Sequence, residues 1–261
     1  MDFTAPDFLA VCCGTLVGLI LGVIGGGGSV LAVPLLVYVV GVKSPHVAIG
    51  TSAIAVAMSA FMNLIDHARR GNVCWPVAIL FAIAGVSGAA IGSTLGKYTE
   101  GQKLLILFGV AMIALAARMA LRRDRADLPR LSIDRSNAPR VAGIGFAAGT
   151  LAGFFGIGGG VLAVPGLVAA TSMPMIMAIG SSLVSVTAFG LTTAAVYAVS
   201  NLIDWRLVLL FVSGSIAGGL TGSRLATRLA VKRRALSLVF AVVVATVGAY
   251  VIVRGIMNVM G

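Results

Sequence analysis

Charged residues are scarce in this sequence. They make up only 10% of the 261 residues, while hydrophobic residues make up 59%. Soluble domains carry about 25% charged residues, so a soluble fold could not keep this much apolar surface away from water. The longest polar stretch, 122–140, is too short for an independent extramembrane domain. The composition therefore predicts an all-α polytopic membrane protein.

Cysteine is also scarce, and the usual catalytic motifs are absent from the sequence. Cys12, Cys13 and Cys74 fall in or beside apolar runs, and the chain has no CxxC pair and no Cys/His cluster. We therefore expect buried small hydrophobic residues at these positions rather than redox or metal chemistry. No phosphate-binding loop, nucleophile elbow, zinc spacing or carboxylate pair is present. We accordingly expect no enzymatic activity, no metal and no cofactor.

Carboxylates are missing from the middle of the apolar segments. All eight acidic residues stand at segment ends or in loops: Asp2, Asp7, Asp66, Glu100, Asp124, Asp127, Asp134 and Asp204. A carrier of protons or sodium ions would be expected to hold a carboxylate within a span. The pattern therefore argues against a cation as the substrate.

Basic residues dominate the charge that is present, giving a net charge of +11. Most of them stand in three clusters, at 66–73, 118–140 and 224–234. Basic loops of membrane proteins face the cytoplasm and anionic lipid. We therefore place these clusters on the cytoplasmic side of the membrane, with membrane lipids and not nucleic acid as partners. The other five basic residues are Lys43, Lys97, Lys103, Arg206 and Arg254.

The start of the chain differs from a cleaved signal peptide. Residues 1–14 contain two aspartates and no Lys or Arg, whereas a signal peptide begins with a basic region. We therefore expect the first apolar segment to be retained as a helix.

The apolar segments fall into two matching sets. The first set lies at 8–24, 29–42, 46–65, 74–95 and 103–121, and the second at 141–157, 160–172, 175–200, 205–227 and 235–257. The stretch "GVIGGGGSVLAVP" recurs as "GFFGIGGGVLAVP" 131 residues later, and "GTS" recurs as "GSS" 130 residues later. We infer an internal duplication. Its parts are a membrane repeat at 1–121, a basic linker at 122–140 and a second membrane repeat at 141–261.

The basic clusters predict how the two repeats are oriented. A basic loop follows the third apolar segment in the first repeat but the fourth in the second. If both loops face the cytoplasm, equivalent loops lie on opposite sides, so each repeat crosses the membrane an odd number of times. The repeats are then inverted, as in secondary transporters with a substrate site near the midplane. Either all five segments cross, or the first two form a re-entrant hairpin and three cross. We favour the hairpin because its arms are short.

Each repeat places a run of glycines where its first two segments meet. Non-helical backbone at membrane depth is tolerated only beside protein or a water-filled cavity. The helix that follows would point its unpaired N–H groups and positive dipole end at the tip, which is an anion-binding arrangement. The predicted first tip comprises Gly26, Gly27, Gly28 and Ser29, and the second comprises Gly158, Gly159 and Gly160. Glycines elsewhere, as in "GVSGAAIG", are attributed to close helix packing.

Hydroxyl residues near the start of the third segments are the other candidate ligands. They are Thr51 and Ser52 in the first repeat and Ser181 and Ser182 in the second. Their hydroxyls could donate to an anion, or bond to the carbonyl of the preceding turn. Because the two repeats match here, we include all four in the candidate substrate site.

The motifs together resemble a known family. The pattern "GxxxGxxGxGGGxxxVP", the "GTS" or "GSS" element and "RRGNVxW" resemble the TauE/SafE sulfite exporter family over nearly the whole chain. The resemblance implies an inner-membrane carrier of sulfur-containing anions such as sulfite, sulfoacetate or other organosulfonates. Our hypothesis is a secondary transporter, working as an exporter, that rocks one repeat against the other. The alternatives are an uptake permease, an anion channel and a non-transporting membrane scaffold, and the oligomeric state (a homo-oligomer included) stays open.

Overall fold

The apolar segments of the sequence become helices that end close to the predicted boundaries. The computed structural model describes residues 5–24, 26–121, 137–228 and 233–260, and within these ranges the chain is helical with no strand. The first half contains α1 (Ala5–Ile24), η1 (Gly26–Leu31), α2 (Ala32–Leu35), η2 (Leu36–Val40), α3 (Pro45–Arg69), α4 (Trp75–Tyr98) and α5 (Gly101–Leu121). The second half contains α6 (Ala138–Phe155), α7 (Gly160–Thr171), α8 (Met175–Ala198), α9 (Trp205–Arg228) and α10 (Arg233–Met260).

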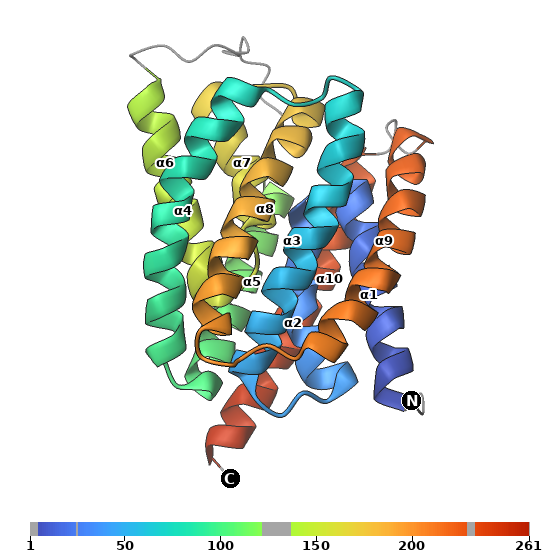
Figure 1. The fold of residues 1–261 in the computed structure, drawn as a ribbon, viewed down its shortest axis with the longest axis vertical. Helices are drawn as coiled ribbons and strands as arrows, with labels where there is room; N and C mark the ends of the chain where they lie inside the picture. Colours follow the sequence, from blue (N-terminus) through green and yellow to red (C-terminus); the bar gives the residue numbers. More distant parts are fainter. Residues whose placement is uncertain (1–4, 25, 122–136, 229–232, 261) are drawn as a thin grey trace.

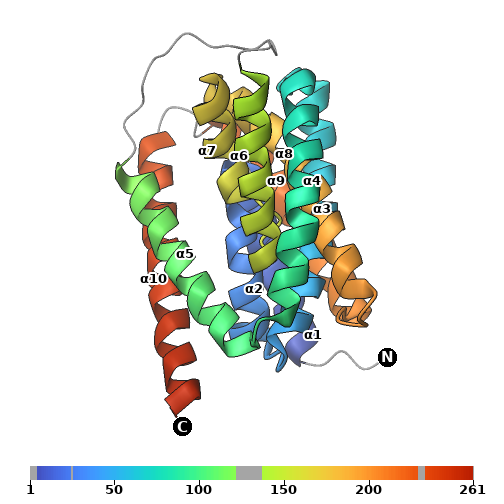
Figure 2. The same ribbon diagram turned by 90° about the vertical axis from the view of Figure 1, so that its left-hand side faces the viewer.

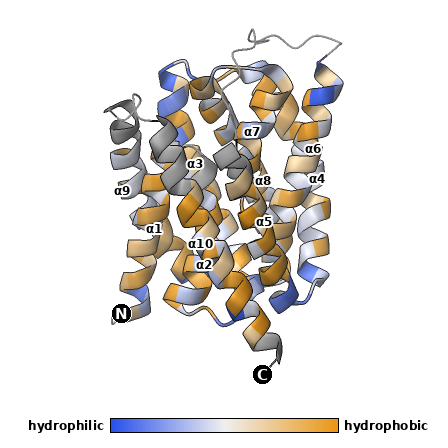
Figure 3. Cartoon of the chain, turned by 180° about the vertical axis from the view of Figure 1, so that it is seen from behind, coloured by the Kyte–Doolittle hydropathy of each residue, from blue (hydrophilic) through white to orange (hydrophobic). Residues whose placement is uncertain are grey.

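Five of the described helices are long and apolar enough to cross a membrane by length and composition. They are α1, α3, α4, α8 and α9, and a span needs about 20 residues. Figure 3 shows hydrophobic residues along the middle of the helices and hydrophilic residues at their ends. The predicted all-helical polytopic class is confirmed for the described chain.

The first glycine tip is not followed by the regular α-helix that the sequence predicted. The arm after it passes from a 3-10 turn (η1) through one α-helical turn (α2) to a π-helical turn (η2). Pro34 lies in this arm and removes one backbone donor. Gly28 lies against α1, where a Cβ atom would be 2.6 Å from the backbone nitrogen of Leu21. The arm therefore follows the surface of α1 with a changing helical pitch, whereas the second tip leads directly into the regular helix α7.

The first two segments of each half fold back on themselves (Figure 1). From the chain start, α1 rises into the bundle and the 26–40 arm returns toward the same end, while α6 and α7 form the matching pair from the opposite end. This shape is what a hairpin requires. The re-entrant interpretation itself stays a prediction.

The two halves interlock through close helix crossings. Helix α1 packs along α9 of the second half, and α6 packs along α4 of the first half. A Cβ atom on Gly18 would overlap the backbone of Ser215, and one on Gly149 would overlap the backbone of Gly85. These two crossings occupy matching positions of the duplication. Small residues allow helix backbones to approach this closely, so the glycines outside the tips serve packing, as expected.

Matching turns lie at opposite ends of the bundle. In Figure 1 the turn between α3 and α4 is at the upper end and the turn between α8 and α9 is at the lower end. The helix ends that flank the three basic clusters all lie at the upper end, although residues 122–136 and 229–232 lie outside the described chain. This is the arrangement that an inverted duplication predicts. The inverted relation, the repeat boundaries and the cytoplasmic side of the basic loops stay predictions.

Buried side chains form two hydrophobic cores that do not coincide with the two halves of the sequence. One core is built on α4, α6, α7 and α8. The other joins α1, the 26–40 arm, α3, α5, α9 and α10, with parts of α8 and of the second tip. Figure 2 shows α5 and α10 side by side at the edge of the bundle. The second tip therefore lies where the two cores meet.

The crossing between α4 and α6 yields a testable prediction. In Gly149→Leu the new side chain would force α6 away from the backbone of Gly85. Overpacking costs about 1–3 kcal/mol and occasionally more, and we expect the upper end of that range because the neighbour is rigid backbone. The measurement is thermal unfolding of the detergent-purified variant.

Gly143→Leu is the matched control, since Gly143 lies on the same helix, is exposed, and has nothing within 4 Å of a built Cβ atom. We expect this control to unfold like the unaltered protein. Equal unfolding temperatures for the two variants would contradict the role of the crossing.

Candidate anion-binding site

The second tip is a backbone turn that only glycine adopts without strain. Gly156, Gly158 and Gly159 have φ angles of +68°, +63° and +77°, in the left-handed region that side chains disfavour. Gly156 and the next residue donate their N–H groups back to carbonyls of α6. For Gly158, Gly159 and Gly160, no hydrogen-bond acceptor is found among the described residues. Within the described chain, three N–H groups at the start of α7 are therefore unpaired.

Apolar side chains surround these unpaired groups. A Cβ atom on Gly158 would lie 3.1 Å from Val56 of α3 and 3.5 Å from Val186 of α8. A Cβ atom on Gly159 would lie 2.6 Å from the ring of Phe189. All three tip glycines are buried. The second tip thus sits between the central helices α3 and α8, away from the ends of the bundle.

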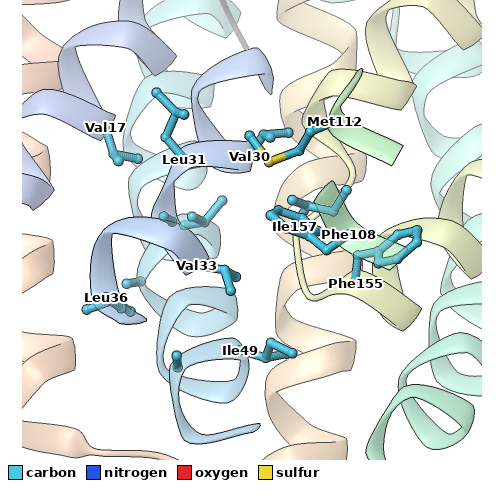
Figure 4. Packing of buried hydrophobic residues seen from close by; sticks show 14 of the residues in the cluster. Val17, Val30, Leu31, Val33, Leu36, Ile49, Phe108, Met112, Phe155 and Ile157 are labelled. Atoms are coloured by element: carbon cyan, nitrogen blue, oxygen red, sulfur yellow. The ribbon is translucent and has the colours of Figure 1, made fainter. Parts of the chain in front are cut away.

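The first tip meets the second. The 3-10 turn η1, which contains Gly26, Gly27, Gly28 and Ser29, contacts both α7 and α8. Gly28 is buried, and Ser29 is buried with 0% exposure. Figure 4 shows Ile157 of the second tip beside Phe108, across from Val30 and Val33 of the first arm. The structure therefore brings the two predicted tips together.

The four predicted hydroxyl residues are buried and already hydrogen-bonded. Ser52 and Ser182 each donate to the carbonyl three residues earlier, at 3.0 Å and 2.8 Å. This is the second of the two roles considered from the sequence. Thr51 accepts the N–H of Asp204 at 3.0 Å, and Ser181 accepts the N–H of Cys74 at 2.9 Å.

These last two bonds are reciprocal. Thr51 and Ser181 are matching positions, and so are Asp204 and Cys74. Each hydroxyl therefore ties the start of a third segment to the residue before a fourth segment of the other half. The two bonds lie with the turns at opposite ends of the bundle. The structure thus does not gather Thr51 and Ser181 at one point, and their role in substrate binding stays a prediction.

Two buried hydroxyls on α8, the helix that contacts the second tip, escaped the sequence analysis. Ser185 and Thr193 are both 0% exposed, and neither hydroxyl has a hydrogen-bond partner among the described residues. They stand four residues before and after Phe189, so all three share one face of α8. Phe189 contacts the second tip. The four-residue spacing is visible in the sequence, but only the tip contact distinguishes it from ordinary helix composition.

The matching face of the first half carries two hydrogen-bonded polar residues. Ser59, at the position that matches Phe189, donates to the carbonyl of Ala55 and shares a short hydrogen bond with Ser215 of α9. Asn63 donates to the carbonyl of Ser59 at 3.0 Å. The duplicated position therefore carries a hydroxyl on α3, paired with one on α9 of the other half, and an aromatic ring on α8.

The cysteines need one correction. Cys13 and Cys74 are buried as expected, but Cys12 is exposed on α1. Adjacent positions on a helix point in different directions, so only one of the two neighbours faces the interior. Among the described residues, no group of three His, Cys, Asp or Glu side chains could hold a metal ion.

Comparison with known proteins assigns the family. The family model described as "Sulfite exporter TauE/SafE" matches residues 10–251. The chain belongs to the TauE/SafE family. It is 48% identical to a probable membrane transporter protein of Xylella fastidiosa strain Temecula1, over 92% of this chain and 93% of that one. It is 24% identical to the probable membrane transporter protein YunE of Bacillus subtilis, over 96% and 98% of the two chains. No solved structure matches the chain.

Membership of this family makes the chain a multi-pass membrane protein of a transporter family, as the sequence predicted. The TauE/SafE pattern includes the glycine tips, so the segments that meet at the centre of the bundle are those that carried the resemblance.

Substitutions at the two reciprocal bonds distinguish a structural role of the Thr51 and Ser181 hydroxyls from a role in substrate binding. In Thr51→Val and Ser181→Ala, the partner N–H loses its acceptor, which costs about 1–3 kcal/mol when the group is buried. We expect both variants to unfold at lower temperature, and Thr51→Ser, which keeps a hydroxyl, to unfold like the unaltered protein. Thermal unfolding in detergent measures this. Unchanged stability with weakened substrate binding would instead place the hydroxyls at the substrate.

Proposed function

We propose that this TauE/SafE protein is a secondary transporter of a small sulfur-containing oxyanion, sulfite or an organosulfonate, working as an exporter in a bacterial inner membrane. The description of the family and the names of the relatives support transport. The substrate class is proposed from the site. Membrane lipids are the expected surroundings, and no catalytic step is required.

The unpaired N–H groups of Gly158, Gly159 and Gly160 carry the proposal. A buried polar group without a partner costs about 1–3 kcal/mol, so a tip with three such groups favours any ligand that can accept from them. A sulfite or sulfonate group presents three oxygens on one side. The positive end of the α7 dipole adds to the attraction.

The charges in the described chain agree with an anion rather than a cation. The described carboxylates, Asp7, Asp66, Glu100 and Asp204, stand at helix ends. None of them lies beside the tips, where a cation would need a negative partner. Neutral donors suit an anion that must also leave, since they hold it less tightly than a buried cation would.

The interlocked packing changes the expected motion. Rocking the first repeat against the second would separate the α1–α9 and α4–α6 crossings, which are the closest backbone contacts between the halves. We propose instead that the moving bodies are mixed. One body holds α1, the 26–40 arm and α9, and the other holds α4, α6 and α7. The second tip lies at their boundary, where alternating access needs its site.

Exchange across a membrane tests the transporter function. Proteoliposomes loaded with unlabelled sulfite should accumulate labelled sulfite by counterflow, and a panel of external sulfonates should compete with it. Counterflow is saturable in a carrier, whereas a channel shows conductance without counterflow. Absence of exchange for every anion tested would favour a scaffold. Uptake and export are separated by comparing net flux in the two directions under one imposed gradient.

Substitution of Thr193 tests whether the face of α8 beside the second tip belongs to the anion site. Because the Thr193 hydroxyl bonds to nothing in the described chain, Thr193→Val removes no internal hydrogen bond and should leave the unfolding temperature unchanged or raised. If the hydroxyl donates to the anion, the same variant should raise the apparent KM about 5- to 10-fold, as loss of one hydrogen bond of about 1 kcal/mol or slightly more implies.

Thr192→Val is the matched control on the same helix, because the Thr192 hydroxyl bonds to the carbonyl of Ala188 at 2.8 Å. We expect this variant to keep its KM. An equal KM for both variants would remove Thr193 from the site. Ser185→Ala repeats the test eight residues earlier on the same face of α8.

A further inference from the structure

A cavity of about 300 Å³ opens at the end of the bundle opposite the basic clusters. It lies where η2, the turn into α3, the first turn of α5 and the C-terminal part of α10 come together, at the lower end in Figure 1. Its polar lining consists of Tyr38, Lys43, Gln102, Tyr250 and Arg254. Lys43 and Arg254 are two of the five basic residues that stand outside the three clusters.

These two cations are unbalanced at their end of the molecule. The other basic residues there have partners: Lys103 pairs with Glu100 at 2.8 Å, and Arg206 pairs with Asp7 at 2.6 Å. Lys97 donates to a serine hydroxyl. Among the described residues, no carboxylate lies within salt-bridge distance of Lys43 or Arg254. Two positive charges therefore line one cavity without a carboxylate of the described chain within salt-bridge distance.

The carboxylates that could have balanced them are engaged elsewhere. Asp204 accepts the N–H groups of Arg206 and Leu207, at 3.0 Å and 3.1 Å, and so caps the start of α9. Basic residues are also disfavoured on the outer side of a membrane. A pair of cations kept in one cavity on that side, without compensation, points to a negative ligand.

Contacts with Tyr250 position the side chain of Arg254 in the cavity. The Arg254 guanidinium carbon lies 5.8 Å from the centre of the Tyr250 ring, and its Nε donates to the Tyr250 hydroxyl at 3.2 Å. Tyr38 packs edge-on against Tyr250, with ring centres 5.3 Å apart. The terminal amino groups of Arg254 remain available, and a guanidinium matches two oxygens of an oxyanion at once.

Neutral groups complete the lining. The Tyr38 hydroxyl is buried and has no hydrogen-bond partner in the described chain, and the same is true of the Gln102 amide oxygen. The hydroxyl can donate to an anion, and the amide can accept the proton of a singly protonated one. Two cations, a donor and an acceptor around a small cavity form a site for an oxyanion of sulfur or phosphorus.

We propose that this cavity, the Lys43–Arg254 pocket, is a second oxyanion site that binds a sulfite, sulfonate or phosphate group at the outer end of the protein. The bound group can belong to a transported anion that has a second binding position outside the tips, or to the headgroup of an anionic phospholipid. Only the first source rests on the proposed function.

Binding to purified protein tests the pocket directly. Lys43→Gln combined with Arg254→Gln removes both charges, and Lys103→Gln removes a paired, exposed charge at the same end as the matched control. Calorimetric titration with sulfite and with inorganic phosphate should show binding at the pocket at least ~10-fold weaker in the double variant, as loss of two charged hydrogen-bonding groups implies, while sulfite binding at the tips is retained. The control should bind like the unaltered protein. Unfolding temperatures of both variants should stay unchanged because the replaced side chains are exposed.

Two further measurements distinguish a phospholipid headgroup from a transported anion as the ligand of the pocket. A phospholipid source predicts phosphatidylglycerol adducts in native mass spectrometry that the double variant loses and the control keeps. A transported anion predicts a raised KM for substrate offered from the pocket side only, in vesicles of known orientation. If sulfite, phosphate and phosphatidylglycerol bind the double variant and the control equally, the pocket is overturned. Absence of counterflow in the unaltered protein would refute the transporter proposal and leave the binding result standing.

Discussion

A helix that begins inside a membrane leaves its first backbone N–H groups without partners, and no water is present to satisfy them. The rest of this structure depends on that constraint. Helix α7 begins between α3 and α8, and three glycine N–H groups at its start are unpaired in the described chain. Glycines with positive φ make the turn possible, and the apolar side chains of Val56, Val186 and Phe189 lie around it. In the proposed function an oxyanion relieves the constraint, because it accepts from several donors at once.

The interlocked crossings explain how such a tip is held. Each hairpin packs its first helix on a helix from the other half, at positions where even a methyl group would collide with backbone. In the proposed motion, the first tip therefore belongs to one moving body and the second tip to the other. The duplication has also diverged there. Ser59 of the first half shares a short hydrogen bond with Ser215 of the second, whereas the matching residue Phe189 covers the second tip. The unpaired hydroxyls of Ser185 and Thr193 lie on the same face of α8 as Phe189. The two half-sites are therefore chemically different.

Much of this arrangement can be predicted from the sequence because membrane segments and glycine repeats carry strong local signals. The helix boundaries and the pairing of the tips follow from the apolar segments and the 131-residue offset. The irregular arm after Gly28 could not be predicted, because its pitch depends on contact with α1. The bonds of Thr51 and Ser181 also escaped prediction, since they join residues more than 100 positions apart. Cys12 and Cys13 could not both face the interior, and only the packing of α1 decides which one does.

The central claim is that the amides of the second tip hold the anion. A structure of the protein determined in lipid with sulfite at saturating concentration tests it most directly. The account predicts bound oxyanion density about 2.7–3.2 Å from the backbone nitrogens of Gly158, Gly159 and Gly160, the usual hydrogen-bond range. Density for the anion elsewhere in the bundle, with these nitrogens still unpaired, would contradict it.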